Sequence, residues 1–217
     1  MTSKSSRISN LEREDKKVVV NNAGEVLSTE TEGHDGIVIA DGADTEVGAR
    51  LAQVLATGTG SVNVDGKVDP KQEVKVTHRV AIDLSDRKLY AYENDTVVKT
   101  LNVVVAEGND NVTGECVGMM CTPTGDFNVW QKLPSQDMSG TLNLADGTVE
   151  TWDVKDAGFV NYFSSGCAIH RIAGGYVADA VMPSIANGSH GCVGIGWDVA
   201  EWFYNWCNMG TSVHIQV

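Results

Sequence analysis

Short stretches of alternating apolar and polar residues, separated by turn-forming residues, fill the chain from Thr77 onward. In the first stretch, Val80, Ile82 and Leu84 alternate with polar neighbours, and after a turn Lys88–Tyr92 runs back. Period-2 alternation bounded by turn formers is typical of antiparallel strands with one buried face. The pattern predicts a mainly β domain over residues 76–217. Its later strands are predicted at Thr96–Val105, Gly125–Gln131, Thr148–Val154, Ser165–His170 and Thr211–Val217.

One helix is predicted near the end of this β domain. Asp198 and Glu201 form a capping-box-like pair that predicts the start of the helix, and Gly210 marks its end. Large aromatic residues at helical spacing usually pack in a core, so we interpret its tryptophans as scaffold. The apolar face consists of Val199, Trp202, Phe203 and Trp206.

The first third of the chain has a different character. Residues 1–16 are polar and without periodicity, which predicts a flexible tail. Residues 17–75 combine strand-like runs with one helix, which Asp44 can cap, and predict a small α+β domain that is marginal on its own. The helix carries an apolar face of Val47, Leu51, Val54 and Leu55. The strands are predicted at Lys17–Val20, Ile37–Ala40 and Ser61–Val64.

The charge of the chain limits its partners. The formal net charge is −13, and acidic residues outnumber basic ones both in residues 1–75 and in residues 76–217. This balance argues against nucleic acid and against anionic lipid surfaces as partners. The sequence has no apolar run long enough for a transmembrane helix and no apolar segment of a signal peptide at its start, so either a cytosolic protein or an exported one without its export segment is expected.

The stretch NGSHGCVGIG, residues 187–196, places Cys192 on an unusually bare backbone, since four of its ten residues are glycine. A structural cysteine packs among bulky apolar neighbours, whereas the glycine-rich backbone around Cys192 indicates a thiol that is presented to a reaction partner. A nucleophilic cysteine needs a base or cation within reach, because the thiolate is the reactive form. His170, at the end of a predicted strand, is the better-positioned base, and His190 with the Gly191 and Cys192 amides could form a donor nest for an oxyanion.

Two other interpretations of these residues remain open. Cys167, His170, His190 and Cys192 have a spacing compatible with zinc, although Cys167 and His170 should lie on opposite faces of a strand. Alternatively, Cys192 is inert and buried, although its flanking glycines offer little to bury it against.

Four motifs together resemble the L,D-transpeptidase catalytic domain of the YkuD type, over roughly residues 78–217. They correspond to the opening hairpin of that family, its TPTG turn, its histidine followed at a distance by [S/T]HGC, and its closing helix. The motifs are Ile82–Ser85 with Leu89–Tyr92, Thr122–Gly125, His170 with Ser189–Cys192, and Glu201–Tyr204. The resemblance implies a β-sandwich or barrel with one or two helices.

The resemblance also implies a reaction. Cys192 would attack the peptide bond before the terminal D-Ala of a peptidoglycan tetrapeptide stem, and the acyl group would pass to the amine of a neighbouring stem, giving a 3→3 cross-link. His170 would be the base, ion-paired with Cys192 and oriented by the backbone carbonyl of Arg171. His190, Gly191 and Cys192 would surround the oxyanion. Substrate-binding positions are expected at Ser189, Trp152, Tyr162 and Gly194, of which Trp152 and Tyr162 would belong to a lid.

The resemblance implies no metal and no cofactor, action in the cell wall or on the outer face of the cytoplasmic membrane, anchoring by a segment that precedes this sequence, and covalent inhibition by carbapenem β-lactams. Gly194 departs from the family, which usually carries Asn or Arg there, and this puts donor specificity in doubt. If the protein is exported, Cys116–Cys121 or Cys167–Cys207 could be bridged. Residues 17–75 weakly resemble part of a peptidoglycan-binding domain. L,D-carboxypeptidase activity and a degenerate wall-binding module are the alternatives.

Overall fold

The computed structural model describes residues 11–40, 43–59, 62, 66–118, 120–143, 147–186 and 188–217, without the side chains of Asp44 and Leu142. It divides the chain into two units. The first consists of the residues up to Val18 with Thr29–Lys75, and the second of Val19–Ser28 with Val76–Val217. The sequence predicted residues 17–75 as one piece, whereas Val19–Ser28 here belong to the second unit. None of the described helices is long and apolar enough to cross a membrane.

The first unit has little regular structure of its own. Strand β3 (Gly36–Ile39) pairs antiparallel with β4 (Gly66–Asp69), and helix α1 spans Ala43–Thr57. The predicted apolar face of α1 is largely exposed, with Leu55 75% accessible. Residues 11–16, predicted as part of a tail, pair instead with this unit through bridges from Leu11 and Glu14. Residues 1–10 and most of the strand predicted at 61–64 lie outside the described residues.

Strands β1 (Lys16–Val20), β2 (Val26–Thr31) and β5 (Glu73–Asp83) each contribute residues to both units. In the second unit, β5 begins the predicted meander with β6 (Lys88–Glu93) and β7 (Thr96–Val104), and all three pair antiparallel. The closing strand β13 (Ser212–Gln216) runs parallel to β5 and antiparallel to β8 (Gly125–Asn128).

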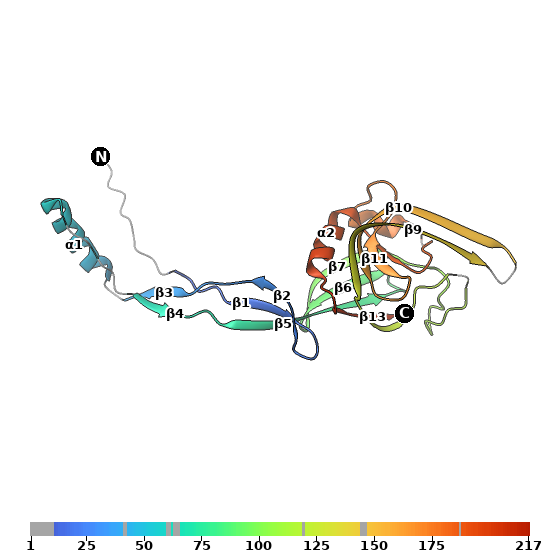
Figure 1. The fold of residues 1–217 in the computed structure, drawn as a ribbon, viewed down its shortest axis with the longest axis horizontal. Coiled ribbons are helices and arrows are strands. Elements are labelled where there is room, and N and C mark those ends of the chain that lie inside the picture. Colours follow the sequence, from blue (N-terminus) through green and yellow to red (C-terminus); the bar gives the residue numbers. More distant parts are fainter. Residues whose placement is uncertain are drawn as a thin grey trace. The chain divides into compact units, whose positions relative to one another are not determined.

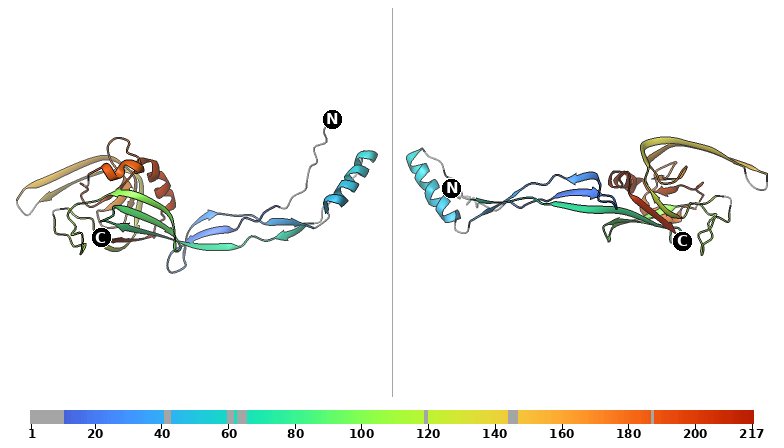
Figure 2. Two further views of the ribbon diagram at one scale, coloured as in Figure 1. Left: turned by 180° about the vertical axis from the view of Figure 1, so that it is seen from behind. Right: turned by 60° about the horizontal axis from the view of Figure 1, so that its bottom comes forward.

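The sheet continues from β7 through β12 (Val193–Ile195), β11 (Ala168–Arg171) and β10 (Val149–Tyr162) to β9 (Gln131–Asn143). Only the pairing between β11 and β12 in this series is parallel. Strands β9 and β10, gold in Figures 1 and 2, form a hairpin that extends past the other strands of the unit. The sequence did not predict β9, because Pro134, Ser139 and Gly140 interrupt its alternation.

Helix α2 (Trp197–Trp206) packs against β10 and β11 (Figure 1). Its face is the predicted one: Val199 and Phe203 are buried, and Trp202 and Trp206 pack against the same core. The predicted capping box is wrong. The helix begins after Gly196 without a side-chain cap, and the Asp198 carboxylate accepts a hydrogen bond from the Asp179 amide instead. Asp179 begins the short 3-10 helix η1 (Asp179–Ser184). The mainly β fold class is confirmed.

Phe203 is fully buried where α2 meets the sheet, so Phe203→Ala should lower the free energy of unfolding by about 3–5 kcal/mol. Val97→Ala, at a strand position that is 43% exposed, should cost less than about 1 kcal/mol. Urea unfolding followed by tryptophan fluorescence measures both, because all five tryptophans lie in the second unit. Equal losses for the two variants would contradict the position of Phe203 in the core.

Candidate active site

The loop before β12 is held in shape by the side chain of Ser189. Its hydroxyl donates a hydrogen bond to the carbonyl of Cys192 at 2.6 Å and accepts one from the amide of Gly191 at 3.1 Å. One side chain therefore ties together the backbone on both sides of His190. Ser189 was expected to bind substrate, but here its hydroxyl is committed to the loop that presents Cys192.

Position 191 requires a glycine, because two neighbouring groups leave no room for a Cβ atom. Its φ is +129°, and a Cβ at this position would lie 2.8 Å from Cys167 Sγ and 3.1 Å from the carbonyl oxygen of Cys121. No other residue type fits this backbone without displacing one of these neighbours. The loop that carries the thiol therefore rests directly on a second loop, the one that contains Cys121.

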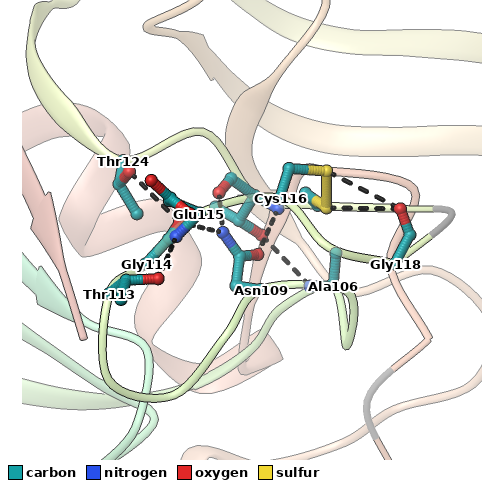
Figure 3. Close-up of a disulfide and its surroundings, with 10 residues drawn as sticks. Ala106, Asn109, Thr113, Gly114, Glu115, Cys116, Gly118 and Thr124 are labelled. Atoms are coloured by element: carbon teal, nitrogen blue, oxygen red, sulfur yellow. Dashed lines mark hydrogen bonds between the residues drawn. A yellow bond between two sulfur atoms is a disulfide. The ribbon is translucent and has the colours of Figure 1, made fainter.

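This second loop is closed by a disulfide between Cys116 and Cys121 (Figure 3), one of the two pairings that the sequence suggested. Asn109 fixes the base of the loop: its side-chain amide donates to the carbonyls of Gly114 and Thr122, and its side-chain oxygen accepts from the amide of Thr122. The disulfide and this bonding together give the Cys121 carbonyl, against which Gly191 packs, a fixed position.

The parallel register of β11 and β12 brings the predicted base and nucleophile to one face of the sheet. His170 pairs with Gly194, and Ile169 pairs with Val193. Cys192 is the residue just before the first paired residue of β12 and therefore lies next to Ala168. Residues two apart on a strand share a face. His170, Gly194 and Cys192 accordingly line the same cavity.

The ring of His170 is oriented by the backbone that follows it. Its Nδ1 lies 2.7 Å from the carbonyl oxygen of Arg171. Because a carbonyl can only accept, Nδ1 carries the proton and Nε2 is left with a free lone pair. Burial lowers the pKa of His170 below its ordinary value of 6.5, with the Arg171 carbonyl opposing this shift. The neutral imidazole, the form that can accept a proton, is therefore the resting form.

The thiol of Cys192 also rests in its neutral form. Burial raises its pKa above the ordinary value of 9.0, although the amide of Ala168, which donates to Sγ at 3.4 Å, offsets part of the rise. Its other partner is the carbonyl of Gly166 at 3.9 Å, and no hydrogen bond between described residues joins it to His170. The ion pair that the family resemblance implies is thus disfavoured before substrate binds, because both groups are desolvated.

The other two unbridged cysteines are poor nucleophiles. Burial raises the pKa of Cys167 to about 11 and that of Cys207 to about 12, and the suggested bridge between them is not formed. Cys167 packs against the core cluster that contains Ile169, whereas Cys192 packs against a separate cluster around Ala168. Within the described part of the chain, the four residues with zinc-like spacing do not form a group whose ligand atoms lie close enough together to hold one ion.

The β9–β10 hairpin covers His190. The ring of Trp152 stacks on the His190 imidazole with centroids 4.4 Å apart, and the carboxylate of Glu150 lies 3.5 Å from His190 Nε2. Trp152 can adopt this position because its cross-strand partner is Gly140, where a Cβ would lie 2.1 Å from the indole ring. Trp152 thus packs on the second histidine of the motif, and its role in binding substrate stays a prediction.

Tyr162 lies at the far end of β10, away from the tip of the hairpin. Its hydroxyl donates to the side-chain oxygen of Gln136 at 2.9 Å, and its ring lies beside that of Trp130, with centroids 5.5 Å apart. Burial raises its pKa above the ordinary value of 10.0, and the nearby Cys192 adds to the rise. Tyr162 therefore forms a wall near the thiol rather than part of the hairpin tip.

Two cavities meet at Cys192, and Met138, Trp152 and His190 also line both. The first, which we call the Gly194 cavity, has a volume of about 300 Å³ and contains His170 and Gly194. The second, the Trp130 cavity, has a volume of about 610 Å³ and contains Tyr162. The thiol is therefore open to ligands from two directions. A partly buried cysteine, a neutral imidazole with a free Nε2 and two approaches suit acyl transfer through a covalent intermediate.

The model of the YkuD family, the L,D-transpeptidase catalytic domain, matches residues 77–215, well over half of the chain. The chain belongs to this family. No curated protein sequence matches it significantly.

Several solved L,D-transpeptidases are similar to this member of the YkuD family. One from Mycobacterium smegmatis is 19% identical, with a TM-score of 0.48, over 71% of this chain and 65% of that one. L,D-transpeptidase 1 of Mycobacterium tuberculosis is 19% identical, with a TM-score of 0.44, over 70% and 68%. L,D-transpeptidase 3 of the same organism is 15% identical, with a TM-score of 0.47, over 96% and 98%.

Some groups around the thiol of this YkuD domain were not predicted from the sequence. The register of β11 and β12 places the Ala168 amide where it donates a hydrogen bond to Cys192 Sγ, and no local sequence pattern encodes this register. Glu150 and Met138 reach the site on the β9–β10 hairpin, whose first strand was not predicted. Trp130 carried a usable signal, because it is a large aromatic residue near the end of the predicted strand Gly125–Gln131. In the structure it lies between β8 and β9 and is 49% exposed.

Ser189→Ala should lower the rate at which Cys192 is acylated by roughly tenfold or more, because the loop loses two hydrogen bonds that fix the thiol. Ser189→Thr, which keeps the hydroxyl, should retain most of the rate. The measurement is the rate of covalent labelling by an acylating inhibitor, followed by mass spectrometry. If the two variants behave alike, the hydroxyl does not position the loop.

The lowered pKa of His170 sets the pH dependence of acylation. The imidazole accepts a proton only when neutral, so the rate should be level above pH 6.5 and should fall with a midpoint below this value. His170→Ala should lower the rate of acylation by about 10²–10⁴-fold at neutral pH. Its residual rate should rise only above pH 9, where the thiol of Cys192 ionises without help. A variant with an unchanged profile would remove His170 from this role.

Proposed function

We propose that the protein is a peptidoglycan L,D-transpeptidase that forms 3→3 cross-links through an acyl-enzyme on Cys192. The observation that carries the proposal is the position of His170 and Cys192 on one face of the sheet, with His170 Nε2 free to accept a proton. Membership of the YkuD family supports the reaction class.

The first half of the reaction acylates the sulfur. Cys192 turns from the Gly166 carbonyl toward His170, its proton passes to Nε2, and the sulfur attacks the carbonyl carbon of the third stem residue. Because the Gly191 amide is already bonded to Ser189, we assign the amide of Cys192 as an oxyanion donor. The intermediate collapses when the imidazolium returns its proton to the leaving nitrogen, so that D-Ala departs and a thioester remains.

The second half repeats the steps with a different amine. The side-chain amine of a neighbouring stem attacks the thioester and gives its proton to His170, and the same proton returns to the departing sulfur. An amide bond replaces the thioester, so the energy of the original peptide bond is kept and no external energy source is needed. The two cavities that meet at Cys192 support a reaction with two large substrates. If water replaced the amine, the protein would act as an L,D-carboxypeptidase.

The same chemistry makes carbapenems covalent inhibitors, because a β-lactam is a strained acyl donor for the same sulfur. A solved L,D-transpeptidase structure contains imipenem. We place the enzyme at the cell wall, outside the cytoplasmic membrane, where its peptide substrate occurs. Wall binding by the first unit stays a prediction.

Incubation with imipenem should add the mass of one inhibitor molecule to the protein, and Cys192→Ala should abolish the adduct while the fold is retained. Cys167→Ala, which removes a thiol whose pKa is raised to about 11 by burial, should still be labelled. An adduct that persists in Cys192→Ala would show that another residue is the nucleophile. A wild-type protein that forms no adduct would support the degenerate wall-binding module instead.

A further inference from the structure

The ladder between β10 and β11 stops just before the base. Its pairs among the described residues are Asn161 with Ile169 and Tyr162 with Ala168. Phe159, which would face Arg171 if the ladder continued, has a φ of +58°. A positive φ at a bulky residue takes the backbone out of the extended conformation. In the described part of the chain, strand pairing on the β10 side therefore does not reach the segment of His170 and Arg171.

The side chain of Arg171 makes a connection to β10 where this pairing ends. Its Nη2 donates hydrogen bonds to the backbone carbonyl of Asp156 at 2.9 Å and to the Asp156 carboxylate at 3.2 Å. The backbone carbonyl of Arg171 accepts the hydrogen bond from His170 Nδ1 at 2.7 Å. One residue therefore holds the base through its main chain and β10 through its side chain.

Asp156 is itself fixed by β9. The register of β9 and β10 shifts between Val154 and Ala157, and Asp156 in this bulge has a φ of +51°. Its amide donates to the Asp137 carboxylate at 2.9 Å, and its carboxylate accepts a hydrogen bond from the Ser135 hydroxyl. Bulges re-aim a strand and its side chains. This one presents both the carbonyl and the carboxylate of Asp156 to Arg171.

The guanidinium group of Arg171 is also positioned by Trp197 and Gly158. Its Cζ lies 3.9 Å from the centroid of the Trp197 ring, and a Cβ at Gly158 would lie only 2.8 Å from it. The side chain of Arg171 is 15% exposed, whereas that of Asp156 is 73% exposed. An ion pair with an exposed partner contributes little to the free energy of unfolding. The main effect of these contacts is therefore on the position of the Arg171 backbone.

We propose that the side chain of Arg171 is a positioning residue for the base: by holding Asp156, it keeps the Arg171 carbonyl where it selects the Nδ1-protonated tautomer of His170. The inference rests on the proposed function, in which Nε2 accepts the proton of Cys192. A ring released from this carbonyl can carry its proton on Nε2 instead. That tautomer cannot take the proton of the thiol at Nε2.

The charge of Arg171 supports the same role. Burial lowers the pKa of His170, the hydrogen bond to the Arg171 carbonyl opposes this shift, and the Arg171 cation adds to it. The cation therefore favours the neutral ring, and the carbonyl of the same residue determines which nitrogen of the neutral ring carries the proton.

The tautomer of His170 can be measured directly on the full-length protein. Two-bond ¹H–¹⁵N spectra at slightly alkaline pH distinguish the two neutral forms of imidazole, and His170→Ala identifies the His170 signals. We expect only the Nδ1-protonated form in the wild type and both forms in Arg171→Met, which lacks the cation and both hydrogen bonds to Asp156. The rate of labelling by imipenem should fall by roughly tenfold or more in Arg171→Met.

Two further variants isolate the contact. In Arg171→Lys the ammonium can replace Nη2, the single atom that makes both hydrogen bonds, so the tautomer should be kept and the rate should stay within about threefold of the wild type. Arg79→Met is the matched control. The Cζ of Arg79 lies 3.8 Å from the centroid of the Tyr92 ring, and Arg79 is not among the described lining residues of either cavity. It should change neither the tautomer nor the rate.

Asp156→Gly tests the contact from the other strand. Glycine adopts the positive φ of this position without strain, and the change removes the carboxylate but leaves the backbone carbonyl. The second tautomer should appear in this variant too, to a smaller extent than in Arg171→Met. If urea unfolding shows that Arg171→Met is not folded, Asp156→Gly decides.

The outcomes separate this inference from the proposed function. An unchanged tautomer in folded Arg171→Met, or in Asp156→Gly when Arg171→Met is not folded, would overturn the positioning role even if the rate fell. A tautomer change of the same size in Arg79→Met would overturn it as well, because the effect would then not depend on Asp156. Absence of an imipenem adduct on the wild-type protein would refute the proposed function, whereas the spectra require no reaction and would still test the role of Arg171.

Discussion

The parallel pairing of β11 and β12 is the constraint on which the site depends. It sets His170 beside Gly194 and Cys192 beside Ala168, so that a base and a thiol separated by 21 residues share one face. Parallel neighbours require a crossover connection between them. Here that connection also supplies Ile172, Ala173, Ile185 and Ala186 to the cavity wall. The segment that makes the parallel pairing possible therefore also builds the wall of the cavity that His170 and Cys192 line.

The same environment explains why the resting groups are neutral. A partly buried thiol and a partly buried imidazole each lose solvation on ionising, and among the described residues only the Ala168 amide donates a hydrogen bond to the sulfur. In the proposed reaction, proton transfer is then coupled to the arrival of a substrate carbonyl, which can take up the developing negative charge. A thiol that stays protonated until that moment is also less exposed to oxidation than a free thiolate, because the thiolate is the form that oxidants attack.

The sequence predicted the parts of this structure that follow local rules. The meander, α2 with buried Val199 and Phe203, and the closing strand all carry clear periodicity, and the Cys192 loop carries a distinctive glycine pattern. The capping box was wrong, because the Asp198 carboxylate bonds to the distant Asp179 amide instead of its own helix. Strand β9 was missed, because glycine and proline within it are tolerated by cross-strand packing, as with Gly140 beneath Trp152. The contacts of Glu150 with His190 and of Ala168 with Cys192 depend on register between distant segments, which single-sequence patterns do not encode.

The disulfide between Cys116 and Cys121 connects this geometry to the conditions of synthesis. The Cys121 carbonyl lies directly behind Gly191, so the backing of the nucleophile's loop is complete only after two thiols have been joined. Such bonds form and persist in oxidising compartments and are rare where thiols are kept reduced. If the protein has the function proposed above, a newly made chain would therefore carry a loosely supported nucleophile loop until the bond between Cys116 and Cys121 has formed.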